Sequence, residues 1–137
     1  MLDKKNLIST MISQHRVLQK DLGAEVELSE SEELHNGLEQ FTKDLVEHLG
    51  LENETFYPEL LKGMKEKEQD TTKTELFIGE MKEIEKAVHA FLDKYNSAEN
   101  IQKDVAEFKQ ELSGIVDALN LRIESEESGV YSYWGLF

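Results

Sequence analysis

The stretch His48-Leu-Gly-Leu-Glu52-Asn-Glu-Thr-Phe56-Tyr57-Pro58 carries an imidazole, a carboxylate and an apolar–aromatic pair at fixed spacing along a predicted helix. Residues four apart on an α-helix lie one above the other, offset by about 40° around the axis. His48 and Glu52 therefore point the same way. This is how a helix presents two metal ligands to the core of a helical bundle.

The same spacing recurs in Arg122-Ile-Glu-Ser-Glu126-Glu-Ser-Gly-Val130-Tyr131-Ser132. Each copy has a leading residue, a glutamate four positions later, and an apolar–aromatic pair eight and nine positions later. The second copy keeps the carboxylate but has arginine where the first has histidine. An arginine side chain stays protonated and has no lone pair to donate to a metal. The difference between His48 and Arg122 therefore decides how a site between the two segments works.

The composition limits the classes of protein to which the chain can belong. Its 137 residues predict one domain, residues 1–137, and a hydrophobic content of 39% is enough for a core. One proline and eight glycines argue against a sandwich or barrel of many short strands. The net charge of −14 disfavours a nucleic-acid partner, because the phosphate backbone would repel the protein. The absence of cysteine excludes disulfides, thiolate metal sites and cysteine nucleophiles.

Membrane and secretion signals are also missing from the sequence. No stretch approaches about 18 consecutive apolar residues, and the first residues lack the apolar run of a signal peptide. We therefore expect no membrane partner and a cytoplasmic location. The chain has neither a Gly-x-Ser-x-Gly elbow nor a phosphate-binding glycine loop, so hydrolytic chemistry has little support.

Apolar residues recur at helical spacing in four segments, which cover approximately residues 3–22, 29–62, 72–95 and 98–131. The connections between these segments are short, so neighbouring helices are expected to run antiparallel. The predicted fold class is therefore all-α, an antiparallel up-down-up-down four-helix bundle.

The ends of the predicted helices carry separate signals. Ser29 and Thr72, each followed by a glutamate three residues later, are predicted to cap the second and third helices. Gly23 should end the first helix, and Pro58 should kink or end the second. Residues 132–137 form an apolar tail that either covers one end of the bundle or contacts a protein partner or a second copy of the chain.

Several polar residues fall where the helical pattern predicts an apolar interior. At about 100° per residue, His15, Glu52 and Glu126 lie inside the apolar stripes, and His48 and His89 lie at stripe edges. Buried carboxylates are rare unless they are paired or bind a metal. These five residues are therefore the candidate metal ligands. The alternative is a metal-free layer of His–Glu hydrogen bonds and an arginine–carboxylate ion pair, retained for packing specificity.

Four segments, one in each predicted helix, resemble the hemerythrin-like (HHE cation-binding) family. They are Gln14-His15-Arg16-Val17-Leu18, His48-x-x-x-Glu52 with Phe56-Tyr57-Pro58, Glu85-Lys-Ala-Val-His89, and Glu126-Glu127-x-x-Val130-Tyr131. The resemblance covers most of the chain. The second-helix match is the most specific, because the first- and third-helix matches rest on single histidines.

The resemblance implies a non-haem di-iron centre in the bundle core. His15 and His48 would be terminal ligands of one iron, and His89 would serve the other. Glu52 and Glu126 would bridge the two ions. Imidazole and carboxylate ligands also suit manganese and zinc.

Arg122 stands where the family has its fourth-helix histidine, and three outcomes follow. The site is a modified di-iron centre, a single-metal centre built on His15, His48 and a carboxylate, or a metal-free site. In the metal-free case Arg122 pairs with Glu52 or Glu126.

These observations lead to functions of different classes. The first is a protein that binds or senses oxygen, nitric oxide or iron, with metal ions and a small diatomic ligand as its partners. An enzyme that reduces peroxide or nitric oxide is permitted by the ligand types, although nothing in the sequence requires it. The alternative is a metal-free regulator that binds a protein partner. Residues 107–127 also resemble the fourth helix of Rsd/AlgQ-type anti-sigma regulators, and Arg122 would then be ion-paired to the core glutamates.

Overall fold

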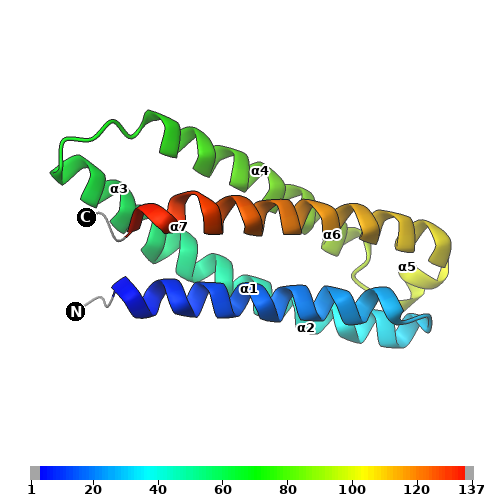
Figure 1. Cartoon of the computed structure of the whole chain (residues 1–137). Coiled ribbons are helices and arrows are strands. Elements are labelled where there is room, and N and C mark those ends of the chain that lie inside the picture. The colour runs from blue at the N-terminus through cyan, green and yellow to red at the C-terminus, as the bar shows by residue number, and fades with distance from the viewer. Residues whose placement is uncertain (1–3, 135–137) are drawn as a thin grey trace.

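The computed structural model describes residues 4–134 and is helical over nearly all of that range (Figure 1). In chain order the elements are α1 (Lys4–Glu27), α2 (Ser31–Leu51), the π-helix η1 (Glu52–Phe56), α3 (Tyr57–Glu66), α4 (Thr72–Lys94), α5 (Ala98–Gln102), α6 (Val105–Ser128) and α7 (Val130–Tyr133).

These elements form four antiparallel rods, which confirms the predicted all-α up-down-up-down bundle (Figure 1). The rods are α1, then α2 with η1 and α3, then α4, and finally α5 with α6 and α7. Helix α1 packs against α2 and α6, and α4 packs against α6. The start of α1 and α7 lie at one end of the bundle, and α5 lies at the other with the α1–α2 turn (Figure 1). None of the described helices is both long and apolar enough to span a bilayer.

Helix α1 is longer than its sequence predicted. It continues through Gly23 to Glu27, where the prediction ended it near residue 22. A single glycine costs a helix only about 1 kcal/mol relative to alanine. The ammonium of Lys109, on α6, donates to the backbone oxygens of Val26, at 2.9 Å, and Leu28. This tertiary contact satisfies carbonyl groups at the end of α1.

The predicted capping boxes at the second and third helices do not form. Glu30 precedes α2 and Thr71 precedes α4, and neither makes a side-chain cap bond. The last rod begins as predicted, since Ser97 Oγ accepts from the backbone N–H of Asn100 at 3.2 Å. It is then interrupted, and the Asp104 side chain caps α6. Packing of the apolar faces stabilises helices in proteins more than their caps do, so helix starts can shift by a few residues.

Pro58 does not end the second rod; it lies in the first turn of α3, directly after an irregular turn. The five residues before α3 form the π-helix η1, in which the backbone N–H of Tyr57 donates to the carbonyl of Glu52. Proline has no N–H, and in an α-helix its ring would clash with the carbonyl four residues earlier, that of Glu54. Widening this turn lets the rod continue through the proline. Single π-turns of this kind are frequent at functional sites.

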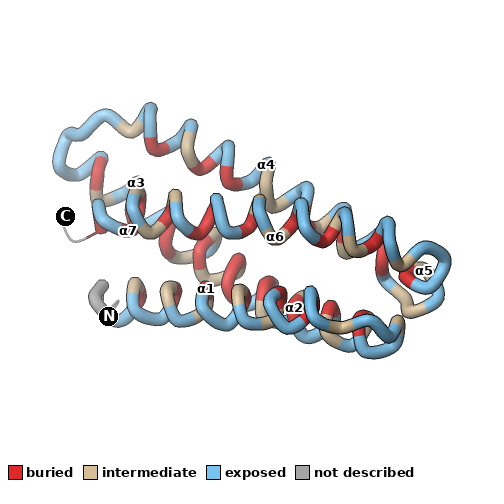
Figure 2. The backbone as a smooth tube through the Cα atoms, turned by 45° about the vertical axis from the view of Figure 1, so that its right-hand side comes forward, coloured by how far each residue is buried: buried red, intermediate tan, exposed pale blue. Residues whose placement is uncertain are grey.

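Two apolar clusters fill the bundle and leave a polar layer between them. One contains Leu18, Leu38 and Phe108 and lies toward the α1–α2 turn. The other contains Met11 and Phe56 and lies toward the end where the chain begins. Figure 2 shows the buried residues in red along the sides of the rods that face one another. The layer between the clusters holds five buried polar side chains: His15, His48, Glu52, Arg122 and Glu126.

The described part of the predicted apolar tail packs on its own bundle. Trp134 is 3% exposed, and its ring lies 5.0 Å from that of Phe56, measured between centroids. Tyr133 beside it is 41% exposed. Trp134 therefore covers one end of the bundle, as the first of the two interpretations predicted. Residues 135–137 of the tail lie outside the described residues.

Glu25 is a buried carboxyl group away from the polar layer. Its side chain packs against Gly37 of α2, where a Cβ atom would collide with Glu25 Oε1, and neither carboxyl oxygen has a hydrogen-bond partner. Burial raises the pKa of Glu25 to about 7, although the charge of Lys109 opposes the shift. The folded protein therefore holds this proton to a higher pH than the unfolded chain does.

We predict that Glu25→Gln stabilises the protein over wild type more strongly at pH 8 than at pH 5. An acid whose pKa is raised on folding stabilises the fold at low pH, and that stability is lost as pH rises from about 4.5 to about 7. The free energy of unfolding of the variant minus that of wild type should be about 1–3 kcal/mol larger at pH 8 than at pH 5. Urea unfolding at the two pH values measures this. Glu27→Gln, at an exposed position, is the control. An equal effect of Glu25→Gln at both pH values would contradict the prediction.

Candidate metal centre

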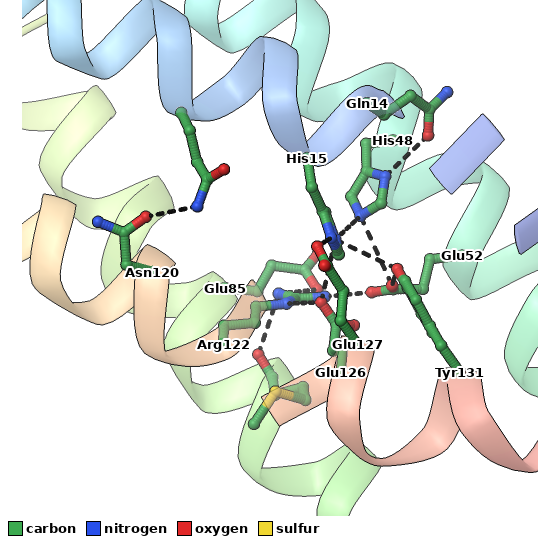
Figure 3. A network of polar contacts seen from close by, with 12 residues as sticks. Gln14, His15, His48, Glu52, Glu85, Asn120, Arg122, Glu126, Glu127 and Tyr131 are labelled. Atoms are coloured by element: carbon green, nitrogen blue, oxygen red, sulfur yellow. Dashed lines mark hydrogen bonds and ion pairs between the residues drawn. The ribbon is translucent and has the colours of Figure 1, made fainter. Parts of the chain in front are cut away.

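Three rods bring four potential metal ligands together at the polar layer (Figure 3). His15 comes from α1, His48 from α2, Glu52 from the first turn of η1, and Glu126 from α6. All four are between 0% and 2% exposed. One donor atom from each residue lies within 4.8 Å of the donor atoms of the others. The predicted convergence of these imidazoles and carboxylates is therefore present in the structure.

The outer nitrogen of each imidazole has an acceptor. His48 Nδ1 lies 2.7 Å from the amide oxygen of Gln14, and His15 Nδ1 lies 2.8 Å from a carboxylate oxygen of Glu127. Both oxygens accept, so each Nδ1 carries a proton and donates it. In a neutral ring the other nitrogen, Nε2, then has a free lone pair. This is the tautomer in which a histidine binds a metal through Nε2.

The two inner nitrogens face each other. His15 Nε2 and His48 Nε2 are 3.0 Å apart. The phenol oxygen of Tyr131 lies 3.2 Å from His15 Nε2 and donates its proton to Glu52 Oε2 at 2.7 Å. Burial lowers the pKa of His15, even though the Glu127 and Glu52 carboxylates favour the charged form. Two lone pairs at this distance repel each other unless a cation lies between or beside them.

Arg122 supplies positive charge on the other side of the carboxylates. Its Nη2 donates to Glu52 Oε1 at 2.5 Å, and its Nε donates to Glu126 Oε1 at 3.4 Å. The remaining terminal nitrogen donates to the backbone carbonyl of Met81 on α4 at 3.1 Å. The same nitrogen lies 3.8 Å from Glu85 Oε2. The guanidinium is therefore fixed by contacts to three rods.

The two buried carboxyl groups titrate in opposite directions. Burial, and then the negative charge of Glu52, raises the pKa of Glu126 well above its usual range. Burial also acts to raise the pKa of Glu52. The neighbouring His48, a hydrogen bond from the protonated Glu126 and the charge of Arg122 outweigh it and hold that pKa far below its usual range. Without a metal, the pair shares one proton and Arg122 balances the remaining negative charge.

Two tyrosines complete the site, and the sequence interpretation gave them no role. Tyr57 donates to Glu126 Oε2 at 2.7 Å and lies 3.1 Å from Glu52 Oε1. Tyr131 bonds to Glu52 on the other side. A signal for both was present, because each occupies the ninth position after the leading residue of its repeat. Gln14 was likewise missed as a partner of His48, and it carries no such signal.

The backbone turn at Gly129, directly after α6, directs Tyr131 inward. Gly129 separates α6 from α7, and its N–H donates to the carbonyl of Ser125 at 2.9 Å. A Cβ atom at this position would lie 2.6 Å from that same carbonyl oxygen, so a side chain does not fit without a shift of the backbone. The turn at Gly129 thus brings the second tyrosine of the repeat to the carboxylates.

The structure does not bring His89 into the cluster. Its side chain is 45% exposed, and its Nε2 lies 3.7 Å from Glu85 Oε1 at the outer face of α4. The buried face of α4 passes through the adjacent Val88 and through Phe91. Helix α4 therefore contributes a carbonyl and a carboxylate beside Arg122 rather than an imidazole. A position at the edge of an apolar stripe leaves the direction of the side chain open, and here it points outward.

A helical bundle that gathers imidazoles and carboxylates in its interior defines a class of cation-binding bundle proteins. The family model of the hemerythrin HHE cation-binding domain matches residues 6–134. The chain therefore belongs to this family, as the sequence resemblance indicated. No curated protein and no solved structure shows a significant match.

We predict that Arg122→Met destabilises the metal-free protein by about 3 kcal/mol or more, because it leaves a buried carboxylate without its partner. Urea unfolding at pH 8 with a chelator present measures the loss. The double variant Arg122→Met/Glu52→Gln should recover much of it. Arg16→Met is the matched control, since Arg16 is 53% exposed and its pair with Glu127 should contribute less than about 1 kcal/mol. An Arg122→Met loss as small as the control's would show that the buried ion pair is not needed.

Proposed function

We propose that the protein binds one transition-metal ion, iron first, through His15, His48, Glu52 and Glu126. The facing Nε2 atoms, 3.0 Å apart with both Nδ1 atoms already donating, carry this proposal. A divalent cation accepts both lone pairs and turns a repulsive contact into two bonds. Two imidazoles and two carboxylates suit iron, manganese or zinc. Family membership in a cation-binding group supports a metal in general.

Arg122 limits the site to a single ion in this proposal. Its guanidinium lies against both carboxylates and supplies a permanent positive charge there. A second metal ion would have to approach that charge, and among residues 4–134 no further imidazole lies at the site, because His89 points outward. Of the three outcomes left open by the sequence, the single-metal centre is therefore the one we propose. Arg122 takes over the charge balance that a second ion would provide.

The proposed role is to bind or sense a small diatomic ligand, or iron itself. Non-haem iron with imidazole and carboxylate ligands can bind oxygen or nitric oxide at an open position. The surroundings favour small ligands, because the ligand residues are at most 2% exposed and an apolar cluster with Phe56 and Trp134 closes one side. The Tyr57 and Tyr131 phenols donate to the carboxylates and hold their orientation. This arrangement supports a binding protein more directly than an enzyme.

A second function, a metal-free bundle that binds a protein partner, is favoured by one observation. The ion pair between Arg122 and Glu52, together with the shared proton on Glu126, already neutralises the polar layer. A bundle of this kind would use its acidic surface to bind a basic partner, as the resemblance to anti-sigma regulators suggests. The metal content of the protein separates the two proposals.

We predict about one iron per chain in protein expressed with iron available, measured by elemental analysis. His48→Ala should lose most of that iron, because it removes one of two imidazole ligands. His89→Ala should retain it and is the matched control. A chelator should lower the thermal midpoint of the wild type but not of His48→Ala, because metal binding stabilises only the folded state. Equal iron in His48→Ala and wild type would refute the proposed ligand set.

We also predict that Arg122→His raises bound iron from about one toward two per chain. The change removes the positive charge beside the carboxylates and adds an imidazole with a lone pair. Elemental analysis together with the near-ultraviolet and visible absorption spectrum measures the effect. Arg122→Met removes the charge without adding a ligand and separates the two contributions. Iron content that stays at the wild-type value in Arg122→His would show that Arg122 is not what limits the site to one ion.

A further inference from the structure

A groove on the outside of the bundle is linked to one of the proposed metal ligands through a single residue. It has a volume of about 450 Å³ and lies between α1 and α2. Seven residues line it: Ser9, Thr10, Ser13, Gln14, Val17, Asp44 and Glu47. The amide oxygen of Gln14, in this lining, is the same atom that accepts from His48 Nδ1 at 2.7 Å. A single side chain therefore separates the groove from a proposed ligand.

Two other sides of the site are closed by hydrogen-bonded groups. Between α1 and α6, Glu127 bonds to His15 and pairs with Arg16, and Gln19 Nε2 donates to Asn120 Oδ1 at 3.0 Å. Figure 3 shows Glu127 and Asn120 on one side of His15, and Gln14 on the other side, beside His48. Toward α4, the guanidinium of the buried arginine fills the layer. Opening either of these sides would break more hydrogen bonds than releasing Gln14 from His48.

The chemistry of the groove suits an approaching cation. Asp44 and Glu47 of α2 provide carboxylates, and Ser9, Thr10 and Ser13 of α1 provide hydroxyl oxygens. Oxygen ligands of these kinds replace part of the water shell of a divalent ion. Carboxylates at the mouth of a groove also raise the local concentration of cations and their rate of association.

We propose that this groove is the route by which a divalent metal ion reaches His15 and His48, and that Gln14 is its gate. The inference rests on the proposed function, because it concerns the loading of that metal site. Gln14 opens the route by giving up its hydrogen bond to His48 Nδ1, which frees the imidazole to turn aside and uncovers the Nε2 side behind it. When it returns, the same bond fixes His48 in the tautomer that presents Nε2 to the metal. Gln14 is thus a positioning residue as well as a gate.

The test is the rate at which the full-length, chelator-treated protein takes up Co²⁺, followed by stopped-flow absorption of the bound ion. Ser13→Phe and Thr10→Phe place a ring in the groove at exposed positions and should each slow uptake about tenfold. Release of Co²⁺ should slow by the same factor, leaving the Kd unchanged, because a blocked route affects both directions equally. Ser113→Phe, at an exposed position on α6, is the matched control and should load at the wild-type rate.

Gln14→Ala removes the gate and should speed both uptake and release several-fold. It should also weaken the Kd, because His48 loses the bond that orients it. Asp44→Asn/Glu47→Gln should slow uptake and reduce its dependence on salt. If Gln14 had a purely structural role, Gln14→Ala would weaken the Kd without speeding the uptake of Co²⁺.

The outcomes separate the route from the function on which it rests. Wild-type uptake rates in both groove-filling variants would overturn the route, and faster uptake in Arg16→Ala alone would place it between α1 and α6 instead. Wild-type protein that binds no Co²⁺ at equilibrium would overturn the proposed metal function and the route with it. Equilibrium binding with slowed exchange only in the groove variants is the result expected.

Discussion

The structure depends on keeping two carboxylates, Glu52 and Glu126, inside a dry bundle. Both are fully buried between two apolar clusters. An unpaired charge in such surroundings is strongly unfavourable, so the bundle must supply hydrogen bonds and positive charge from its own side chains or from a bound cation. Arg122, two tyrosines and one shared proton provide them in this chain. Two facing imidazoles then form a place where a cation adds further compensation.

Irregular backbone builds much of this arrangement. The wide turn before Pro58 gives one helix both Glu52 and Tyr57 facing the same layer, five residues apart. The turn at Gly129, after α6, likewise directs Tyr131 toward the carboxylate of Glu52. An uninterrupted α-helix could not place these groups in the same way, because its side chains repeat every 3.6 residues. Each irregular turn therefore lies beside a residue that contacts a site carboxylate.

The arginine of the second repeat sets the character of the site. In the first repeat the leading residue, His48, offers a lone pair to the interior, and in the second Arg122 offers donors and charge. The site is consequently asymmetric, with imidazoles on one side of the carboxylates and a guanidinium on the other. This asymmetry is the physical basis for proposing one metal ion, and it also explains why the metal-free protein can be charge-balanced. The α1–α2 groove lies on the imidazole side, where its lining residue Gln14 accepts from His48 Nδ1.

The sequence by itself determined the helical bundle and the inward placement of His15, His48, Glu52 and Glu126. Those predictions depend only on local periodicity, which a helix converts directly into direction. The direction of His89, the partners of each Nδ1 and the contacts of Arg122 were decided only by the tertiary structure. They depend on how separate rods rotate and slide against one another, and at a stripe edge a small rotation turns a side chain inward or outward. The tertiary structure also decided where α1 ends, since Lys109 from α6 bonds to carbonyl groups beyond Gly23.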